Sequence, residues 1–566
     1  MKWEKRSTFN TIEEVVLNNS GLTKEEFFVD ENKKYRIDNL KEVAELITDC
    51  VNKKLKITII GDYDADGINA SAIMKMAIDS IGGQVTVRLP KRFSEGFGLS
   101  EKIVDEIDSG LLITVDNGIA AIDAVKKAKD KGLIVIVTDH HLPNEDENGN
   151  KMIPDADIVI DPNAIDNSAD FNGYCGAGIA YKIAEELIPD NKVLLSKLIC
   201  FAAIGTVADV MPLIHENRRI VEKGLKNMTY SKSRTKGLES ILRVCELNKH
   251  ITSTNIGFKI GPMINAPGRL YDDGANISLN ALIHDSTYDE KIGLKLNEIN
   301  EKRKEIIEDA MNRIDINIST NCLYGDYPLV IYEPNLNEGI IGIIAGRLAE
   351  KFNSPTIVFT DSEEPNILKG SGRSACGVDL KALLDLNANL LYKYGGHESA
   401  AGVSIEKDNL YELSDMLKET IEEPVEDNFN DTIYYDLEIP ADKISETFIE
   451  LRKYEPFGEG NPRPVFKVNE YRLSPRYSSY FKTMGKDNSV LKVYGVKSSG
   501  IGFGMTEKYT ELKEPKVLDL IGTISQNFFR DIPELQVEIV DMVSGEQKIK
   551  KSAVSKKLAE LAKNRY

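Results

Sequence analysis

The stretch "ITIIGDYDADGINASAIM", residues 57–74, joins an apolar strand pattern to a helical pattern through an acidic turn. Three aspartates, Asp62, Asp64 and Asp66, lie within five positions of one another in this turn. Carboxylates this close repel one another, and keeping them ionised beside a core costs free energy unless a positive species compensates. The segment therefore predicts a strand–turn–helix unit that carries a cation site.

Short β-rich runs alternate with helical patterns around this unit. Such alternation favours an α/β fold built on a parallel, doubly wound sheet with helices on both faces. One of the helical patterns ends on a glycine, which is a common helix stop. The expected strands cover residues 56–60, 85–89, 111–115, 133–138 and 157–160, and the expected helices between them cover 68–81 and 119–132.

The rest of the chain is expected to form further units. A mostly helical stretch, 176–315, ends in a charged helix whose apolar stripe could join two lobes. Strand patterns at 327–332 and 355–360 indicate a second, smaller α/β lobe, and repeated short strands after 432 indicate a small barrel or sandwich. We divide the chain into an N-terminal extension (1–40), a catalytic domain (41–285), a connector helix (286–322), a second lobe (323–410), a β-rich domain (430–545) and a basic tail (546–566).

The composition is that of a globular protein with several domains. The chain has 566 residues, of which 42% are hydrophobic and 28% charged. It begins without an apolar leader, and no apolar run approaches membrane-spanning length. The six cysteines are far apart and form no CxxC pair, which favours reduced thiols in a cytoplasmic protein.

The net charge of −19 argues against a protein coated in basic surface. Two windows depart from this average, because 218–237 and 548–566 each carry seven basic residues and one acidic residue. Taken alone, either window is most simply a solvated face. Beside a site that cleaves phosphate esters, the two windows would indicate a track for a polyanion.

Acidic and histidine side chains follow two more of the expected strands. Asp116 comes directly after the third strand, and Asp139, His140 and His141 come directly after the fourth. The carboxyl ends of parallel strands meet at one edge of the sheet, where open α/β sheets place their ligand crevice. Asp209 lies in an apolar stretch, where an aspartate is costly without a partner. We expect these side chains to converge with the acidic turn.

Carboxylates with one or two imidazoles suit Mn²⁺ or Mg²⁺ better than zinc. Clustered carboxylates that hold two such ions about 3.5–4 Å apart hydrolyse phosphate esters, so the site is interpreted as a two-metal centre. An isolated aspartate after a strand is more often a turn or helix cap. The DxDG pattern also occurs in haloacid-dehalogenase-type phosphatases, which form an aspartyl-phosphate. Neither alternative explains the adjacent histidines together with Asp209.

Four motifs in this order, "DYDADG", "VDNG", "TDHH" and "GTVADVMPL", resemble those of the DHH phosphoesterase superfamily. Further motifs are similar to the RecJ branch of that superfamily. They are "IGPMINAPGRL" (260–270), "GSGRS" (370–374) and "GGHESAAG" (395–402), which resemble RecJ with its DHHA1 lobe, and "YEPFGEGNPRPVF" (454–466), which resembles its oligonucleotide-binding (OB) domain. The resemblance spans residues 40 to 545. It implies a metal-dependent exonuclease that digests single-stranded DNA from the 5′ end to mononucleotides, in DNA repair and recombination.

The resemblance also implies roles for the clustered residues. His141 would face the scissile phosphate and stabilise charge on it, and Asp139 would orient the histidines. Within the acidic turn, Asp64 and Asp66 rank ahead of Asp62, because the superfamily's ligands form a DxD pair directly before the glycine. The implied catalytic and metal-binding set is Asp62, Asp64, Asp66, Asp116, His140 and Asp209 for two Mn²⁺ or Mg²⁺ ions, with His141 as a further catalytic residue.

Phosphate contacts are implied on both lobes. Arginine suits this role because it forms bidentate hydrogen bonds to phosphate, and glycines let backbone N–H groups approach an anion closely. The implied contacts are Arg92, Asn265 and Arg269 in the catalytic domain, and Ser371, Arg373, Gly395, Gly396 and His397 in the second lobe. The chain departs from the family pattern at two places. Leu336 and Asn337 stand where Trp-His is expected, and Phe97 stands where a tyrosine is usual.

The β-rich domain contains the segment "RLSPRYSSYFKTMGK", in which aromatic and basic residues alternate. Aromatic rings beside cations suit stacking on the bases of a single strand, whereas the same rings could equally be barrel core. These two interpretations have equal weight from sequence. The residues concerned are Arg472, Arg476, Lys482, Lys486, Tyr477, Tyr480 and Phe481.

The leading hypothesis is therefore a monomeric, cytoplasmic exonuclease whose partners are single-stranded DNA, a single-strand-binding protein and a helicase. One alternative is another DHH phosphodiesterase, acting on short oligonucleotides or cyclic dinucleotides. The length of the chain and its third, β-rich domain argue against it, because such substrates need no track beyond two lobes. The other alternative is a non-catalytic, replication-associated binding protein, which would have lost metal-site acids that this chain retains.

Overall fold

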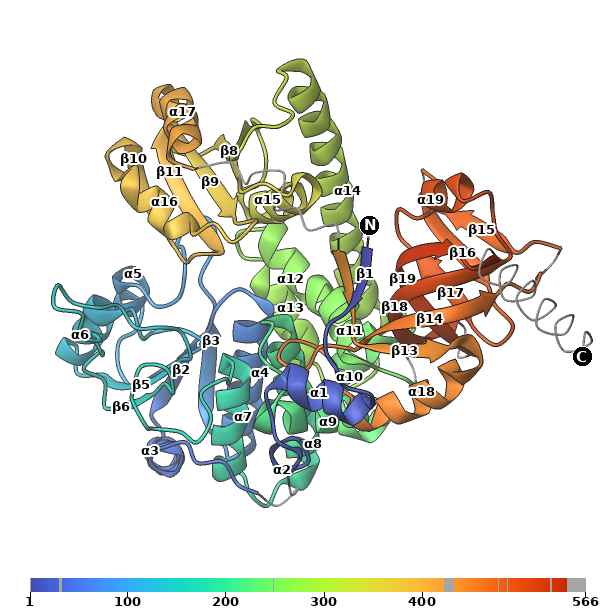
Figure 1. Ribbon diagram of the computed structural model, residues 1–566. Helices are drawn as coiled ribbons and strands as arrows, with labels where there is room; N and C mark the ends of the chain where they lie inside the picture. Colours follow the sequence, from blue (N-terminus) through green and yellow to red (C-terminus); the bar gives the residue numbers. More distant parts are fainter. Residues whose placement is uncertain are drawn as a thin grey trace, which may run out of the picture.

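The acidic turn follows the second strand of a five-stranded parallel sheet, so the predicted fold class is confirmed (Figure 1). The computed structural model describes residues 2–29, 33–247, 249–421, 432–476, 478–485, 487–529 and 532–546. In spatial order the strands of this sheet are β3 (Gln84–Arg88), β2 (Lys56–Ile60), β4 (Leu111–Val115), β5 (Ile134–Thr138) and β6 (Ile158–Ile160).

Helices cover both faces of this sheet, as a doubly wound fold requires. One face packs against α3 (Leu40–Asn52), α4 (Ala65–Ser80) and α7 (Gly176–Leu187). The other packs against α5 (Glu101–Asp105) and α6 (Ile122–Asp130). All five residues of β4 are buried, because this strand has neighbours on both sides and helices on both faces.

The strand order reverses next to β2. The chain passes from β2 outward to β3, returns to the other side of β2 at β4, and then continues through β5 to β6. Loops that leave neighbouring strands in opposite directions open a crevice at their carboxyl ends. The acidic turn and the loops after β4 and β5 all lie at this switch point.

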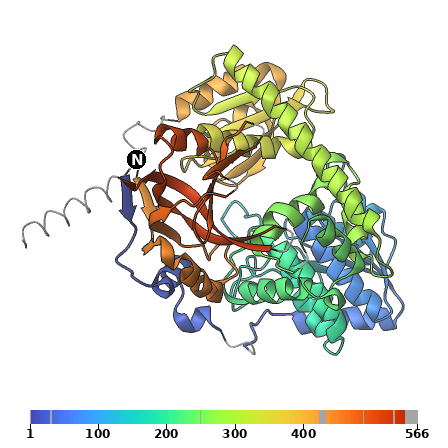
Figure 2. The same ribbon diagram turned by 90° about the vertical axis from the view of Figure 1, so that its right-hand side faces the viewer.

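The stretch after the sheet is helical, as predicted. It contains α8 (Lys192–Ala208), α9 (His215–Met228), α10 (Lys236–Val244), a short α11 (Ser253–Asn255), the π-helical turn η2 (Ile256–Ile260), α12 (Gly261–Leu270) and α13 (Ala275–Ile283). The connector helix, α14 (Glu290–Thr320), follows and runs from the catalytic body to the second lobe (Figure 2).

The second lobe is a mixed five-stranded sheet with helices. Its strand order is β10 (Leu391–Gly396), β11 (Ala400–Glu406), β9 (Ile367–Arg373), β8 (Thr356–Asp361) and β7 (Leu329–Tyr332). Helix α15 (Glu338–Phe352) joins a hydrophobic core with α12 and α14, so the lobe is packed against the catalytic body through these three helices. Helices α16 (Leu380–Leu386) and α17 (Leu410–Thr420) pack on the sheet's other core.

The C-terminal body is a seven-stranded sheet. Its order is β13 (Leu437–Pro440), β14 (Val465–Arg472), β18 (Val517–Phe529), β19 (Ile532–Ser544), β17 (Ser499–Gly502), β16 (Val490–Tyr494) and β15 (Phe481–Met484). Helices α18 (Ile444–Leu451) and α19 (Thr506–Glu511) accompany it. Most of the predicted basic tail, residues 547–566, lies outside the described residues, as do Tyr477 and Lys486.

The N-terminal segment packs into the C-terminal body. Strand β1 (Lys2–Lys5) pairs in parallel with β12 (Thr432–Tyr435), and Figure 1 shows the N-terminus beside that body. From the helices α1 (Ile12–Ser20) and α2 (Lys24–Phe27), the side chains of Val15, Val16 and Phe27 are buried in the C-terminal core. The first residues of the chain therefore complete a core made chiefly by the last hundred described residues.

Two arginines of the basic window 218–237 are buried, and one of them joins the catalytic and C-terminal bodies. Arg218 donates to the carbonyl oxygen of Glu455 at 2.7 Å, and its guanidinium lies 4.5 Å from the centre of the Phe27 ring. Arg234 donates to the carbonyl oxygen of Met228 at 2.5 Å. The predicted polyanion track is therefore wrong for these two buried arginines.

Within the described ranges, no helix is both long and apolar enough to cross a bilayer.

Candidate metal centre

The acidic turn after β2 also begins helix α4. Asp64 caps this helix, because its Oδ1 accepts hydrogen bonds from the backbone N–H groups of Asp66 (2.9 Å) and Gly67 (3.0 Å). A carboxylate at a helix N-terminus is stabilised by the helix dipole. Capping uses only one oxygen of Asp64, so the other oxygen is available to a ligand.

Asp66 points from α4 to the N-terminus of α7. Its Oδ2 accepts from the N–H of Gly176 at 2.6 Å, and its Oδ1 accepts from the N–H of Ala177 at 3.0 Å. Each carboxylate oxygen has a second lone pair, so these bonds orient Asp66 without excluding it as a metal ligand. The start of α7 thus fixes one acid of the site.

Asp116 follows β4 in a left-handed conformation, with φ of +62°. Its neighbour Asn117 is fully buried and holds this loop in place. The Asn117 side chain donates to the carbonyl oxygens of Ile60 (3.1 Å) and Val115 (2.9 Å) and accepts from the N–H of Leu99 (3.0 Å). The ends of β2 and β4 are therefore tied together beside the acid.

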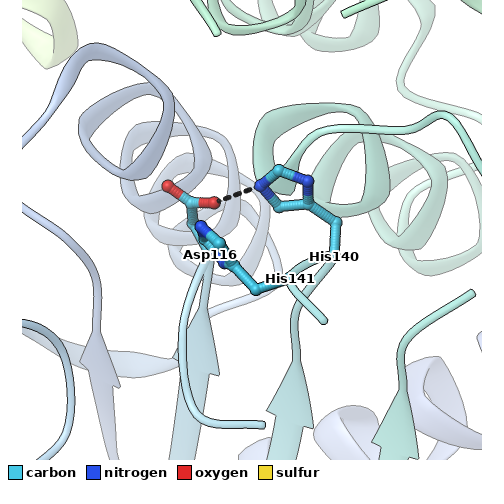
Figure 3. A group of neighbouring side chains, drawn as sticks. All are labelled: Asp116, His140 and His141. Atoms are coloured by element: carbon cyan, nitrogen blue, oxygen red, sulfur yellow. Dashed lines mark ion pairs between the residues drawn. The ribbon is translucent and has the colours of Figure 1, made fainter. Parts of the chain in front are cut away.

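The histidine loop follows β5 and brings two imidazoles next to Asp116 (Figure 3). His140 Nε2 lies 3.0 Å from Asp116 Oδ1. His141 points beside it, and its Nδ1 lies 2.7 Å from Asp139 Oδ1. Asp139 also accepts from the backbone N–H groups of both histidines and, through Oδ2, of Ile119. This buried aspartate has the position expected of a group that orients the histidines.

Asp209 caps the carboxyl end of α8 and completes the cluster. Its Oδ2 lies 3.7 Å from His140 Nε2, and Asp66 Oδ2 lies 3.8 Å from the same nitrogen. Three groups in the described chain have ligand atoms within 4.8 Å of one another. These groups are Asp62–Asp64–Asp116, Asp66–His140–Asp209 and Asp116–His140–His141. The structure therefore brings together all six metal ligands that the resemblance implies, together with His141.

Four buried polar atoms of this cluster have no hydrogen-bond partner: Asp62 Oδ1, Asp116 Oδ1, His140 Nε2 and Asp209 Oδ2. Buried polar atoms are almost always hydrogen-bonded, so a convergent set without partners requires an explanation. All four are from side chains that ligate Mn²⁺ or Mg²⁺, and none is a thiolate. The residues present therefore fit a pair of such ions.

The electrostatics support the same interpretation. Burial first, and neighbouring carboxylates second, raise the pKa of Asp62, Asp64, Asp116 and Asp209, the last to about 8. Burial lowers the pKa of His140, which favours the neutral imidazole that binds metals. Burial is the largest single effect on His141 and disfavours its charged form, but the hydrogen bond to Asp139 and the charges of Asp139, Asp209 and Asp64 together outweigh burial and raise the pKa of His141 to about 9. A protonated His141 can donate to a phosphate oxygen.

The phosphate contacts expected in the catalytic domain lie beside the acidic turn. The Arg92 guanidinium stacks 4.4 Å from the centre of the Tyr63 ring. Arg269 is at the end of α12, one turn after Asn265, and donates to the carbonyl oxygen of Gly339 at 3.1 Å. A Cβ atom on Gly268 would lie 3.0 Å from the carbonyl oxygen of Tyr63, so α12 touches the acidic turn directly.

The second lobe presents its expected contacts on neighbouring strands. On β9, Arg373 donates to the Ser371 hydroxyl at 3.0 Å. The sheet register places Ser371 opposite Gly402, and Gly402 opposite Gly395. Nothing lies within 4 Å of the Cβ position at either glycine, so this strip of backbone is open. The predicted Ser371 and Gly395 therefore share one accessible row with Gly402, which was not among the predicted contacts. The other predicted glycine, Gly396, pairs with Ala401 instead, and a Cβ atom there would lie 2.4 Å from the carbonyl oxygen of Ala400.

His397 lies beside this row, in the exposed turn after β10. In the part of the chain that the structure describes, it makes no ion pair or hydrogen bond with the acidic cluster.

The residues that depart from the family pattern, Phe97, Leu336 and Asn337, make structural contacts. Phe97 packs edge-on against the His141 ring with centroids 5.6 Å apart. Asn337 caps α15 and donates to the carbonyl oxygen of Leu270 at 3.3 Å, while Leu336 is buried core.

The aromatic and basic segment of the C-terminal body has structural contacts. Phe481 packs edge-on against Tyr509 at 5.2 Å, and Arg476 forms an ion pair with Glu534 at 2.5 Å. Lys516 lies 4.8 Å above the Tyr480 ring. For Phe481 the structure therefore favours the core interpretation over a platform for bases, and the exposed Arg476 is held by its ion pair with Glu534.

Several supporting residues could not be recognised from sequence. A Cβ atom on Gly176 would lie 2.4 Å from Asp116 Cβ, and one on Gly205 would lie 2.3 Å from Asp66 Oδ1, so both helices need glycine to approach the acids. No local pattern marks these positions. Asp161, in contrast, follows β6 as the other acids follow their strands, so its position was a usable signal. It is buried, and it holds Asn163, which donates to the carbonyl oxygen of His140 at 2.6 Å.

Three family models match the chain: "DHH family, N-terminal domain" at residues 56–206, "DHHA1 domain" at 325–423 and "RecJ OB domain" at 435–541. The single-stranded-DNA-specific exonuclease RecJ of Haemophilus influenzae is 30% identical over 537 residues, which is 89% of this chain and 90% of that protein. RecJ from Thermus thermophilus in complex with Mn²⁺ has the same fold, with a TM-score of 0.74 at 24% identity over 93% of this chain and 75% of that chain. A second structure, exonuclease RecJ bound to manganese, gives a TM-score of 0.57 at 27% identity over 68% of this chain and 94% of that chain.

Proposed function

Because this chain belongs to the RecJ family of single-stranded-DNA-specific exonucleases, we propose that it hydrolyses single-stranded DNA from the 5′ end and releases mononucleotides. The observation that carries the proposal is the convergence of buried carboxylate and imidazole atoms without hydrogen bonds at the switch point of the sheet. Two Mn²⁺ or Mg²⁺ ions held there would neutralise developing charge and activate a water for attack on phosphorus.

The side chains of the site have separate roles in this proposal. Asp62, Asp64, Asp66, Asp116, His140 and Asp209 hold the ions. His141, kept protonated by Asp139, donates to a non-bridging oxygen of the reacting phosphate, where charge increases in the transition state. Arg92, Asn265 and Arg269 on one lobe, and Ser371, Arg373, Gly395, Gly396 and His397 on the other, hold phosphates of the strand between the lobes.

A groove between the catalytic and C-terminal bodies supports a single-stranded substrate. Its volume is about 980 Å³, and it is lined from the catalytic side by Lys249, His250 and Phe258 and from the C-terminal side by Phe503 and Phe528. The His250 and Phe528 rings stack with centroids 4.1 Å apart, and Phe258 is 82% exposed. Exposed rings beside lysines suit unpaired bases and their phosphates.

The experiment compares DNA substrates that have a free single-stranded 5′ end with substrates that have none. A linear single strand labelled at its 5′ end should be reduced to labelled mononucleotide in Mn²⁺ or Mg²⁺, and it should remain intact in chelator. A covalently closed single-stranded circle and a blunt duplex should persist, because the strand must be threaded from a free end. The Asp116→Asn variant is the matched inactive control. Rapid cleavage of the circle would contradict the proposal, and so would release of nucleotides from the 3′ end first.

The proposal extends to location and partners. A cytoplasmic protein accords with the six cysteines, none of which is in a disulfide. A single-strand-binding protein and a helicase are the proposed partners, since the first coats and the second generates such a substrate. The enzyme is proposed to act as a monomer, because one chain supplies the metal centre, both lobes and the groove.

A further inference from the structure

Two arginines that the family resemblance does not assign lie next to the expected phosphate contacts. Arg303 is on the connector helix α14, and Arg347 is on α15. They extend a group with Arg92, Arg269 and Arg373, and these five residues are called the arginine cluster below. Burial and three positive neighbours within the cluster lower the pKa of Arg269 to about 10, and Arg347 is a like-charged neighbour of Arg303.

The packing directs Arg303 into the joint between the lobes. Ile299, Asn300 and Ile307 of α14 are buried, and Arg303 lies on the same helix face at spacings of three and four residues. The core on this face is shared with α12 and α15. Two buried polar atoms of this face have no hydrogen-bond partner, Arg303 Nε and Asn300 Oδ1.

The cluster lacks the carboxylate partners that arginines have elsewhere. Arg88 pairs with Glu95 at 2.6 Å, and Arg313, further along the connector helix, pairs with Glu333 at 2.6 Å. Among the described residues, no member of the arginine cluster forms an ion pair with a carboxylate. The chain has 90 acidic and 71 basic side chains, so five arginines without one carboxylate ion pair among them are unusual, and they suit a ligand of negative charge.

The arginines of the cluster differ in whether they lie beside the acids of the metal centre. Asp64 of the metal centre is an electrostatic neighbour of Arg269. The corresponding neighbours of Arg303 are Arg347 and Glu301, with no metal-site acid among them. The three arginines lie on α12, α14 and α15, which share one hydrophobic core, so the cluster continues from the acidic turn that α12 touches onto the joint between the lobes.

We propose that Arg303 and Arg347 form an anion subsite for a backbone phosphate of the single strand that is not the phosphate being cleaved. This inference rests on the proposed function. Because α14 joins the two bodies, a phosphate held here would fix the strand at the joint while the metal centre acts on the next linkage.

The test measures equilibrium binding of a 5′-phosphorylated single strand in chelator, by fluorescence anisotropy over a range of salt concentrations. Arg303→Gln and Arg347→Gln should each weaken binding roughly tenfold at low salt, the effect expected for a charge-assisted hydrogen bond. Each should also reduce the slope of log K against log salt by about 0.7, the value for one lost phosphate contact on a single strand. Arg303→Lys should keep the slope, and Lys295→Gln, an exposed position on the same helix, should change neither quantity.

Strands with one uncharged methylphosphonate linkage identify the phosphate. A methylphosphonate at the linkage held by the subsite should weaken binding of the strand to the wild type. The same replacement should not change the affinity of Arg303→Gln for the strand. In steady-state cleavage, Arg303→Gln should raise KM and leave kcat within about twofold, because the contact is equal in the ground and transition states. Unchanged salt slopes and methylphosphonate profiles in both glutamine variants would overturn the subsite while the wild type still bound and cut. A wild type that failed to bind and cut would overturn the proposed function and the subsite together.

Discussion

The surroundings of Asp209 disfavour the ionised form of its side chain. Burial and the charges of Asp66 and Asp64 raise its pKa from 3.8 to about 8. A group with a higher pKa in the folded than in the unfolded protein binds extra protons on folding. Its contribution to stability is complete below the unfolded pKa and is lost as the pH rises through the folded pKa. For Asp209 that loss covers the range from pH 4 to 8, and Asp62, Asp64 and Asp116 act in the same direction.

The first prediction isolates this residue. Asp209→Asn removes the titration and keeps the shape, so in chelator the wild type should lose unfolding free energy relative to the variant between about pH 4 and pH 8. Chemical denaturation at several pH values measures the difference. The variant should also lose cleavage by a factor of about 100 or more, because loss of even an outer partner of a metal site costs about 10–100-fold. A constant stability difference across this range would show that Asp209 does not titrate as stated.

A second prediction concerns the ions. Metal binding requires ionised carboxylates, so Mn²⁺ should raise the melting temperature of the wild type more at about pH 8 than at about pH 5. Asp209→Asn should show a smaller rise at both values. Equal shifts in the two proteins would place the stabilising ion elsewhere.

Among the elements, helix α7 is the main support of the site. Its first N–H groups bind Asp66, and its first residue lies against Asp116. Two acids, one on α4 and one in the loop after β4, are thus positioned by one helix end. This arrangement makes the geometry of the metal centre depend on a residue that contributes no side chain.

The third prediction tests this dependence. Gly176→Ala should displace Asp116, because the new Cβ would lie 2.4 Å from Asp116 Cβ. We expect metal affinity, measured by calorimetry, to fall by about 10–100-fold and stability to fall by about 1–3 kcal/mol. Gly178→Ala on the same helix is the matched control. Its nearest neighbour would be 3.6 Å away, and it should be neutral or stabilising by up to about 1 kcal/mol. Equal metal affinity in both variants would refute the role of Gly176.

The helices and strands show which features of the structure can be predicted from neighbouring residues in the sequence. Strands β2 and β4 begin and end at the predicted residues because apolar runs with turns at both ends encode them. The acids could be placed at one edge because parallel strands share a direction. In contrast, Gly176, Gly205 and the structural use of Arg218 depend on segments far apart in sequence, for which one sequence contains no spacing signal. Phe481 was ambiguous for a related reason, since a ring in a barrel core and a ring on its surface follow the same pattern.

At the scale of the whole molecule, the N-terminal segment links the ends of the chain. Phe27 is buried in the C-terminal core, against the Tyr454 ring at 5.9 Å and under the Arg218 guanidinium of the catalytic body. One side chain therefore contributes to three parts of the molecule.

The fourth prediction follows from this contact. Phe27→Ala should destabilise the C-terminal body by about 3–5 kcal/mol, as for other buried aromatic side chains, and calorimetry should show its transition at a lower temperature. Phe28→Ala is the matched control, since the adjacent ring is 44% exposed and should cost much less. Unfolding that is the same in Phe27→Ala and wild type would mean that the N-terminal segment is not part of this core.

The pairing of β1 with β12 has a consequence for synthesis on the ribosome. Lys5 pairs with Tyr435, so the first strand of the chain waits for a partner that is translated several hundred residues later. At about 5–20 residues per second, this interval lasts tens of seconds. The catalytic body and second lobe can fold in that time, while Val15, Val16 and Phe27 still lack their core. These apolar side chains thus stay without their core during elongation, and a chaperone that binds exposed apolar side chains would find them accessible until the last strands emerge.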